Sequence, residues 1–432
     1  MSEAQPAKLP DNIFEGPWTR NPKIVDLNDL DSFVGGVPHD ALDTIRAQYP
    51  MYWNEEKREW GPGFWNLTRY QDIVEVSRDT GTFSSDAGIN ISFPPDVEPA
   101  VINAVIGNMI TMDPPEHRAY RNIAKPFFST RSVTSLEARV RELARDIVAG
   151  AVRKLRDTGS CDVMTDIAAP LPISVLCDIL GVPQEDWKKI FDWSNELIGI
   201  FDPDMCPDPE GATATFMELF TYGQHLVEER RKTPGDDLMT AIALAKPEDG
   251  QEIPAHLLNG FFLLMVVAGN ETTRNSISGG IHALIENPEQ RDRLVQQPAI
   301  LPTAVEEILR WVSPVSHMRR TATRAATIGG HPVEEGDKVV MWYGAGNRDP
   351  SVFDRPRMFD VTRDPNPHIA FGIGEHFCLG SRLARLQLNV IFEELLRVVP
   401  TFDFTLAGDV RYVRTNFING IKAMPATFTP VG

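Results

Sequence analysis

The longest apolar run in the chain is LLNGFFLLMVVAG, residues 257–269, and it continues directly into the polar sequence NETTRN. Thirteen residues are too few to cross a bilayer, where a helix needs roughly 20 apolar residues. A helix that is apolar on most of its sides is typically buried inside a protein core. The run therefore predicts one long helix over residues 254–286 that passes through the core of the fold.

Apolar residues recur at helical spacing in three other segments, and strand signals are shorter and weaker. The predicted helices are residues 132–157, 302–311 and 383–398, and the predicted strands are residues 63–68, 338–341 and 401–406. The 34 prolines are spread along the chain, which indicates many short connections. The chain is therefore expected to be mainly α with small β-sheets.

Charge and cysteine content exclude several classes of protein. With 42 basic and 60 acidic residues the net charge is −18, so nucleic acid and anionic membranes are not expected as partners. The four cysteines contain no C-x-x-C pair, which argues against a zinc ribbon, an iron–sulfur cluster or covalently attached haem. The N-terminal sequence is polar and has no apolar signal core, so we expect a cytoplasmic protein whose first 20 residues are poorly ordered.

The segment PHIAFGIGEHFCLGSRLARLQL is the most informative part of the sequence for chemistry. Its glycines allow tight turns and leave backbone N–H groups free near Cys378, and a predicted helix begins just after it. N–H groups and a helix N-terminus both lower the pKa of a thiol, so Cys378 could be a nucleophile or a metal ligand. A small buried hydrophobe is the ordinary alternative for a lone cysteine. A dinucleotide loop is not expected, because Phe377 breaks the G-x-G-x-x-G pattern.

The ten residues FGIGEHFCLG resemble the haem-binding signature of the cytochrome P-450 superfamily. The resemblance implies that Cys378 is the axial thiolate of haem b, a ligand that favours O–O cleavage. It also implies one haem-thiolate domain over residues 1–432, with the haem between the long central helix and the cysteine loop. The other residues of the loop that would contact the cofactor are Phe371, Gly372, His376 and Gly380.

The sequence AGNETTRN in the predicted central helix is similar to the oxygen-activation motif of the same family. Cleavage of an O–O bond needs protons to be delivered inside a dry pocket. A hydroxyl can orient a water molecule there, and a carboxyl can relay protons from solvent. Glu271 and Thr272 fit these two catalytic roles, and the small Ala268 would leave room for the cofactor. Taken alone, the motif could equally be a helix with solvated polar residues.

Glu307 and Arg310 in EEILR are spaced so that they share one helix face. Such pairs usually lie on the surface, but the resemblance implies a buried structural pair bonded to the loop before the cysteine. The family often adds an arginine at the position that Met358 occupies here. Arg357 or Arg363 is expected to replace it.

The sequence MDPPEHRAYRNIAKPFF resembles the helix that supplies cations to the haem propionates. His117 and Arg121 lie one helical turn apart, and Arg320 and His376 match the other propionate contacts of the family. Four donors suit a buried dianion. For the neighbouring Arg319 we expect a solvated or locally paired side chain.

Together these motifs predict a monooxygenase that inserts one atom of O2 into a C–H bond of a terpenoid, alkyl-aromatic or steroid-like molecule. By position in the family, the substrate pocket is expected to consist of Ile89, Ile91, Phe93, Ile106, Leu264, Val267, Val315, His317, Phe417 and Ile418. Residues 90–109 and 200–210 would be substrate-gating loops or variable surface connections.

Electrons from NAD(P)H are expected to arrive through a separate reductase and ferredoxin, because the chain has no predicted flavin or iron–sulfur module. An acidic ferredoxin needs a basic dock, for which Arg118, Lys125, Arg382 and Arg385 are the candidates. The alternatives are a haem-binding sensor or carrier, a peroxygenase, and a thiolate hydrolase or transferase without haem.

Overall fold

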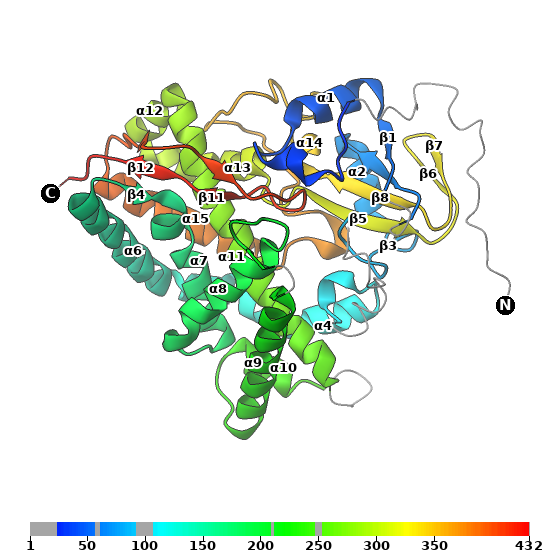
Figure 1. Ribbon diagram of the computed structural model, residues 1–432, viewed down its shortest axis with the longest axis horizontal. Helices are drawn as coiled ribbons and strands as arrows, with labels where there is room; N and C mark the ends of the chain where they lie inside the picture. Colours follow the sequence, from blue (N-terminus) through cyan, green and yellow to red (C-terminus); the bar gives the residue numbers. More distant parts are fainter. Residues whose placement is uncertain (1–23, 57–60, 92–106, 209–210, 247–252, 432) are drawn as a thin grey trace.

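The 32-residue helix α11 (Ala255–Glu286) passes through the middle of the structure, with 19 of its residues buried. The computed structural model describes residues 24–56, 61–91, 107–208, 211–246 and 253–431. In Figure 1, α7 (Pro170–Leu180), α8 (Trp187–Ile198) and α9 (Ala212–Lys232) lie along α11, and all three contact it. The buried central helix predicted from the apolar run is confirmed.

The other predicted helices are present with small differences in their bounds. Residues 302–311 and 383–398 correspond to α13 (Leu301–Val312) and α15 (Ser381–Val398), both of which pack on α11. Residues 132–157 are divided into α5 (Thr130–Ser135) and α6 (Glu137–Thr158). The break follows three serines whose hydroxyls bond one another or nearby carbonyl groups, a competition that weakens a continuous helix.

The remaining helices are shorter and cover the core. They are α1 (His39–Gln48), α2 (Tyr70–Arg78), α4 (Glu116–Ala124), α10 (Leu238–Ala243), α12 (Pro288–Gln296) and α14 (Tyr343–Gly346). Short helical turns, mostly of the 3-10 type, are η1 (Leu30–Phe33), η3 (Met109–Thr111), η4 (Lys125–Phe128), η5 (Met164–Ala168), η6 (Gln184–Asp186), η7 (Pro298–Ile300) and η8 (Gly374–His376).

The largest sheet has five strands in the order β1-β2-β8-β5-β3 and lies to one side of the helices (Figure 1). Its strands are β1 (Met51–Asn54), β2 (Phe64–Leu67), β3 (Phe83–Ser84), β5 (His317–Ala322) and β8 (Lys338–Trp342), and only β2 and β8 run parallel. The predicted strands at 63–68 and 338–341 are therefore confirmed as β2 and β8.

Three smaller sheets complete the described strands. They are β4 (Cys161–Asp162) with β12 (Pro425–Thr427) and β9 (Thr405–Leu406), β6 (Ala326–Ile328) with β7 (His331–Val333), and β10 (Arg411–Tyr412) with β11 (Ile421–Ala423). The predicted strand at 401–406 is wrong for its first four residues. Phe402 has a φ of +47°, a left-handed conformation that interrupts an extended strand.

Both faces of the large sheet are covered. Val339 and Met341 of β8 belong to one apolar cluster with Trp65, whereas Val340 and Trp342 belong to another with Phe64. Alternate residues of a strand point to opposite faces, so one strand contributes to two layers of core. A third and larger cluster fills the space between the helices.

Three expectations concern the parts of the chain that lie outside the described residues. The first 20 residues are not described, and neither are residues 92–106 of the predicted loop 90–109. The predicted loop 200–210 is described as far as residue 208 and contains no helix or strand there.

Among the described helices, none is both long enough and apolar enough to span a membrane.

Candidate active site

The cysteine loop is a tight turn that places Cys378 just before α15. Gly372 and Gly374 have φ angles of +67° and +76°, and the amide of Cys378 donates to the carbonyl oxygen of Phe371 over 2.9 Å. A Cβ atom on Gly374 would lie 2.6 Å from the backbone oxygen of Ser77. Glycine is therefore required at this position both by the backbone conformation and by the close approach of α2.

A large cavity lies between this loop, α4, α11, β5 and α15. It contains about 1390 Å³ of space between atoms, part of it open to solvent. Cys378, Phe371, Gly372 and Gly380 line it, and so do Ala268 and Thr272 of α11. The thiol of the sequence motif and the hydroxyl of the second motif thus face one space, although 106 residues separate them in the chain.

One face of α11 provides its contribution to this cavity. Leu264, Ala268, Thr272 and Ser276 follow one another at intervals of four residues and all line the cavity. The Thr272 hydroxyl donates to the carbonyl oxygen of Ala268 over 3.0 Å. Thr272 therefore presents its hydroxyl on the helix face that borders the cavity.

Glu271 lies outside this face, although it is the next residue to Thr272. It is 1% exposed and is not among the described residues that line the cavity. Its carboxylate forms an ion pair with Arg274, one turn further along α11. Burial raises the pKa of Glu271 to about 7, although the guanidinium opposes this shift. The carboxyl thus titrates near neutral pH at the edge of the site.

All four predicted propionate donors line the same cavity. The rings of His117 and His376 lie 4.2 Å apart, and Ser85 Oγ is 3.3 Å from His376 Nε2. Arg121 donates to the carbonyl oxygen of Phe377, and Arg320 donates to that of Arg319 over 2.7 Å.

These donors lack an anionic partner. None of His117, Arg121, Arg320 and His376 forms an ion pair among the residues that the structure describes. Burial lowers the pKa of His117 to about 4 and that of His376 to about 2, and it also lowers the pKa of both arginines. Buried donors without an anion fit a ligand that carries its own negative charges.

Tyr343 is a cavity residue that the sequence did not reveal. It lies on α14, is 5% exposed and lines the cavity beside Arg320, whose charge opposes the rise in the tyrosine pKa that burial causes. No motif surrounds Tyr343 in the sequence. It enters the site only because α14 follows β8, which pairs with β5 and its Arg320.

The environment of Cys378 contains opposing effects on its thiol. Burial raises the pKa of Cys378, whereas a backbone N–H group of Gly380 and the guanidinium groups of Arg121 and Arg385 lower it. N–H donors and cations are the groups that hold a thiolate. A thiol, four unpaired donors and a small-residue helix face on one cavity therefore fit a flat dianionic cofactor with a metal at its centre.

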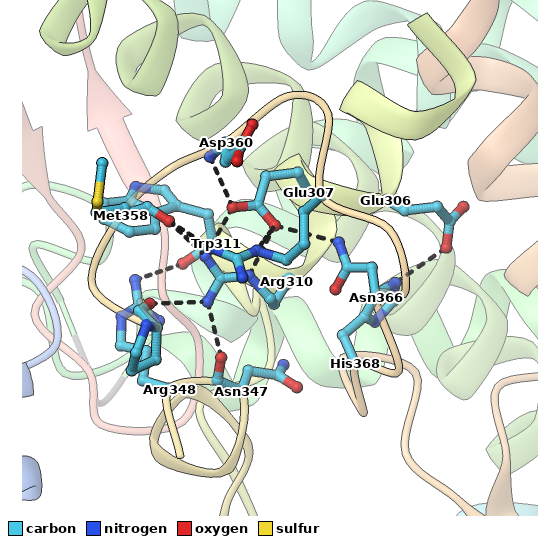
Figure 2. A network of polar contacts seen from close by, with 12 residues as sticks. Glu306, Glu307, Arg310, Trp311, Asn347, Arg348, Met358, Asp360, Asn366 and His368 are labelled. Atoms are coloured by element: carbon cyan, nitrogen blue, oxygen red, sulfur yellow. Dashed lines mark hydrogen bonds and ion pairs between the residues drawn. The ribbon is translucent and has the colours of Figure 1, made fainter. Parts of the chain in front are cut away.

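The pair Glu307–Arg310 (Figure 2) is fully buried, and neither residue belongs to the described lining of the cavity. Its two hydrogen bonds are both 2.7 Å long. Arg363 supplies the third charge, with its Nε 3.0 Å from Glu307 Oε2. Arg357 instead pairs with Asp40 and Asp43. Of the two replacements considered for the missing arginine, the structure selects Arg363.

Met358 takes part in this network through its backbone. Its carbonyl oxygen accepts from Arg310 over 3.1 Å and from Arg363 over 3.0 Å, while its side chain is 46% exposed (Figure 2). Asp360 N and Asn366 Nδ2 donate to the two oxygens of Glu307. The network thus fixes residues 354–366, the segment that leads to the cysteine loop.

The residues predicted for the substrate pocket coincide only in part with the lining of the cavity. Leu264 and Val315 line the cavity, whereas Phe93 and Ile106 lie outside the described residues. The others are absent from the described lining, namely Ile89, Ile91, Val267, His317, Phe417 and Ile418.

Alternation and helical phase explain these differences. In β5, Met318 and Arg320 face the cavity, so His317 points to the other face, where it contacts Trp342 and Phe417 and lies 3.0 Å from the carbonyl oxygen of Asn416. Val267 lies on the same side of α11 as Glu271.

Ile91 packs in the apolar cluster of the N-terminal region. The backbone oxygen of Ile89 accepts from the Arg319 amide, and Ile418 forms a backbone bridge with Val315. Other apolar residues take the places of the missing ones, namely Met109, Ile110, Phe128, Pro172, Leu176, Met265, Pro314 and Met318.

The structure shows how Arg319 and Arg385 are paired. Arg319 is buried, not solvated, and donates to the carbonyl oxygens of Ala87 and Gly88. Arg385 is held by both oxygens of Glu306, at 2.6 and 2.8 Å, and lies over the ring of Phe371. Arg385 is only partly exposed, and its charge is paired with Glu306, which reduces its value as a docking cation.

The other three predicted docking cations are exposed. Arg118 is paired with Glu375, whereas Lys125 and Arg382 have no ion-pair partner in the described chain. Glu375 is part of the cysteine loop, so its ion pair with Arg118 neutralises one of the predicted docking cations.

Comparisons with known proteins agree with the geometry of this site. The sequence profile of the family described as Cytochrome P450 matches residues 61–412. The chain is 39% identical to linalool 8-monooxygenase of Pseudomonas putida, an alignment that covers 94% of this chain and 99% of the relative. It is 38% identical to the methyl-branched lipid omega-hydroxylase of Mycobacterium tuberculosis, over 94% and 95% of the two chains.

A solved structure gives the same result for the fold. The cytochrome P450 CYP268A2 of Mycobacterium marinum, in complex with pseudoionone, superposes with a TM-score of 0.83 at 36% identity. The superposition covers 90% of this chain and 94% of the other. The mainly helical fold with small sheets predicted from the sequence is confirmed.

Proposed function

This chain belongs to the cytochrome P450 family, and from that premise we propose that it is a ferredoxin-dependent monooxygenase that hydroxylates a methyl-branched terpenoid or lipid. The observation that carries the proposal is the shared cavity of Cys378, Thr272 and the four unpaired propionate donors. Cys378 would hold haem b through its thiolate, and the haem would supply the activation of O2. His117, Arg121, Arg320 and His376 would hold the propionates.

The residues of this chain then bind the substrate and handle protons. The apolar lining around Leu264, Met265 and Met318 excludes water from the reacting carbon. Methionine side chains adapt to irregular shapes, which suits a branched aliphatic substrate. Thr272, on the face of α11 that lines the cavity, would orient a water molecule there, and Glu271, on the neighbouring face of α11, would supply protons.

The substrate class rests on the relatives and on the lining. The two named relatives act on linalool and on a methyl-branched lipid, and both of these molecules are apolar and branched. The described lining offers no carboxylate to clamp a charged substrate. A steroid-like or alkyl-aromatic molecule is the second candidate.

A ligand screen on the purified holoprotein tests the proposal. Linalool, a methyl-branched fatty acid and a sterol are added in turn, and the shift of the haem from low to high spin is followed by absorption. We expect the two branched aliphatic probes to give the larger shifts. The ferrous–CO complex should show the strongly red-shifted band of thiolate ligation, and a protein without a Soret band would refute the haem assignment.

Three measurements separate the alternatives. A sensor or carrier would form no product from a bound probe in the presence of ferredoxin, reductase, NADPH and O2. A peroxygenase would turn over equally well with hydrogen peroxide alone. In a monooxygenase, Thr272→Ala lowers the fraction of NADPH electrons recovered in product, because water release competes with substrate oxidation.

The ferredoxin interface can be tested at Arg382 and Lys125, which are exposed near the cysteine loop. Charge reversal by Arg382→Glu should slow reduction by an acidic ferredoxin and weaken the dependence of its rate on salt. Lys188→Glu on the exposed side of α8 is the matched control. If the two variants are reduced equally fast, the docking surface lies elsewhere.

A further inference from the structure

A second Glu–Arg pair lies on α11, directly beside the oxygen-activation motif. Glu271 and Arg274 are 1% and 0% exposed, and their side chains form an ion pair at the i,i+3 spacing. Glu271 and Val267 occupy the helix face next to the one that carries Ala268 and Thr272. The pair therefore holds the carboxylate away from the cavity that its neighbour Thr272 lines.

The contacts of Arg274 lead to α8. Its Nη1 donates to Asn195 Oδ1, and its guanidinium lies 6.0 Å from the centre of the Phe191 ring. The adjacent Asn270 donates to Ser194 Oγ over 2.8 Å. Phe191 and Asn195 are only partly buried, so α8 is the layer that separates the pair from solvent.

The pair is weakly secured by other groups. Glu271 Oε2 and Arg274 Nη2 contact each other in the ion pair, and Arg274 Nε has no hydrogen-bond partner within the described residues. Asn270 Nδ2 is 3.5 Å from Glu271 Oε1, at the limit of a hydrogen bond. A buried charge pair with an unsatisfied donor is costly, and burial favours the protonated form of the Glu271 carboxyl.

Other charged groups on the elements around α11 are engaged elsewhere. On α8, Lys188 pairs with Asp192, and Lys189 lies over Trp193. On the other elements packed against α11, the charged residues whose side chains are paired have partners other than Glu271 and Arg274. These are Asp178 with Arg139, Asp166 with Lys154, Glu218 with Trp193, Glu306 with Arg385, Glu307 with Arg310, Glu394 with Arg397, and Lys422 with Asp202. Arg274 is thus the charge that acts on Glu271.

We propose that Arg274 is a positioning residue for proton delivery, which holds the Glu271 carboxylate on the α8 side of α11 and controls its access to Thr272. The proposal rests on the monooxygenase function above. Each turnover takes up O2, two electrons and two protons, oxidises one C–H bond to C–OH and releases one water. Glu271 gives a proton toward Thr272 and regains one from solvent between α8 and α11, while Arg274 keeps its own protons throughout.

The sign of the pH effect follows from this arrangement. Glu271 donates only when protonated, and burial places its pKa at about 7, so coupling falls as the pH rises through neutrality. Arg274→Gln removes the neighbouring cation, which raises the pKa of an acid by about 1–3 units. The fall in coupling should therefore move to higher pH by the same amount.

The experiment measures product formed per NADPH consumed by the holoenzyme with ferredoxin and reductase, from pH 5.5 to pH 9. Arg274→Gln should shift the profile upward, and Arg274→Lys should restore it toward the wild type. In Glu271→Gln, coupling should be low at every pH, and adding Arg274→Gln to it should change nothing further. An Arg274→Gln profile that overlays the wild-type profile overturns the proposal, as does an effect of Arg274→Gln that persists in the Glu271→Gln background.

A second variant decides the matter if Arg274→Gln does not fold. Asn195→Asp keeps the size of a partly buried side chain and offers Arg274 a competing carboxylate. It should raise the pKa of the Glu271 carboxyl. The infrared C=O band of the protonated carboxyl reports this pKa directly, in a difference spectrum between Asn195→Asp and the double variant Asn195→Asp/Glu271→Gln. An unchanged titration refutes the role of Arg274. This readout needs no turnover, so it remains informative if the wild-type enzyme forms no product and the proposed function itself fails.

Discussion

Two neighbouring helices each carry a buried glutamate and an arginine three residues later, and the two pairs differ in what surrounds them. Glu307–Arg310 on α13 receives further hydrogen bonds from Arg363, Asn366 and the amide of Asp360 (Figure 2). In Glu271–Arg274 on α11 the carboxylate has one further contact, with Asn270 Nδ2 at 3.5 Å, and Arg274 Nε has no hydrogen bond inside the described chain. The spacing is the same, yet one pair is saturated and the other is not.

The difference separates a structural pair from a functional one. A fully bonded ion pair fixes the backbone around it, here residues 354–366, and has no polar atom left for other chemistry. In an incompletely bonded pair beside a cavity, the desolvation of the charges is not fully compensated by hydrogen bonds. Such a pair can exchange partners or protons. Buried charge alone therefore says little about its role, whereas the completeness of its hydrogen bonding is informative.

The largest effect is expected from breaking the saturated pair. Arg310→Met leaves the Glu307 carboxylate buried beside Arg363 alone, and truncation of one partner of a buried pair costs about 3–5 kcal/mol. Urea unfolding of the holoprotein measures this loss. If Arg310→Met unfolds at the wild-type urea concentration, the network in Figure 2 is not a stabilising one.

The unsaturated pair should make stability depend on pH in the opposite sense to an ordinary paired carboxylate. The pKa of Glu271 is raised from 4.5 to about 7 in the folded protein, so the folded state binds the extra proton between these values. Stability from this group is complete below pH 4.5 and is lost as the pH rises to about 7, by about 3 kcal/mol.

Glu271→Gln provides the measurement. The difference in unfolding free energy between the variant and the wild type is followed from pH 5 to pH 8, so that the titration of all other groups cancels. The variant should gain in relative stability as the pH rises. A difference that stays constant over this range contradicts the raised pKa of Glu271.

A smaller effect is expected at the third partner of the saturated pair. Arg363→Met removes the ion pair with Glu307 and the bonds to the carbonyl oxygens of Asp354, Arg355 and Met358. Arg310 and Asn366 still satisfy Glu307, so the cost should be about 1–3 kcal/mol. The same urea titration measures it, and a cost equal to that of Arg310→Met would show that Arg363 is the principal cation.

The smallest effect is expected at Met358. Its side chain is exposed and only its carbonyl oxygen joins the network, so Met358→Arg should change stability by no more than about 0.5 kcal/mol. A large gain on introducing the arginine of the common family pattern would mean that Arg363 fills that place poorly.

The sequence predicted the site well where the chemistry requires a particular residue type at a fixed spacing. The ten-residue cysteine motif and the acid–alcohol motif identified the family, and the apolar run located the buried central helix. The strands were less well predicted, because a residue such as Phe402 in a left-handed conformation leaves no mark in an apolar pattern. The substrate pocket was the weakest part, since its residues are defined by which face of a strand or helix meets the cavity.

His317 and Met318 illustrate this limit. They are adjacent in β5, and only the pairing of β5 with β8 decides that Met318 faces the cavity and His317 faces Trp342. The sequence by itself determined the family, the thiol and the hydroxyl, because these depend on residue identity at fixed spacing. The tertiary structure decided how completely each of the two Glu–Arg pairs is hydrogen-bonded and which of two adjacent residues faces the cavity, because both depend on neighbours that are distant in the chain.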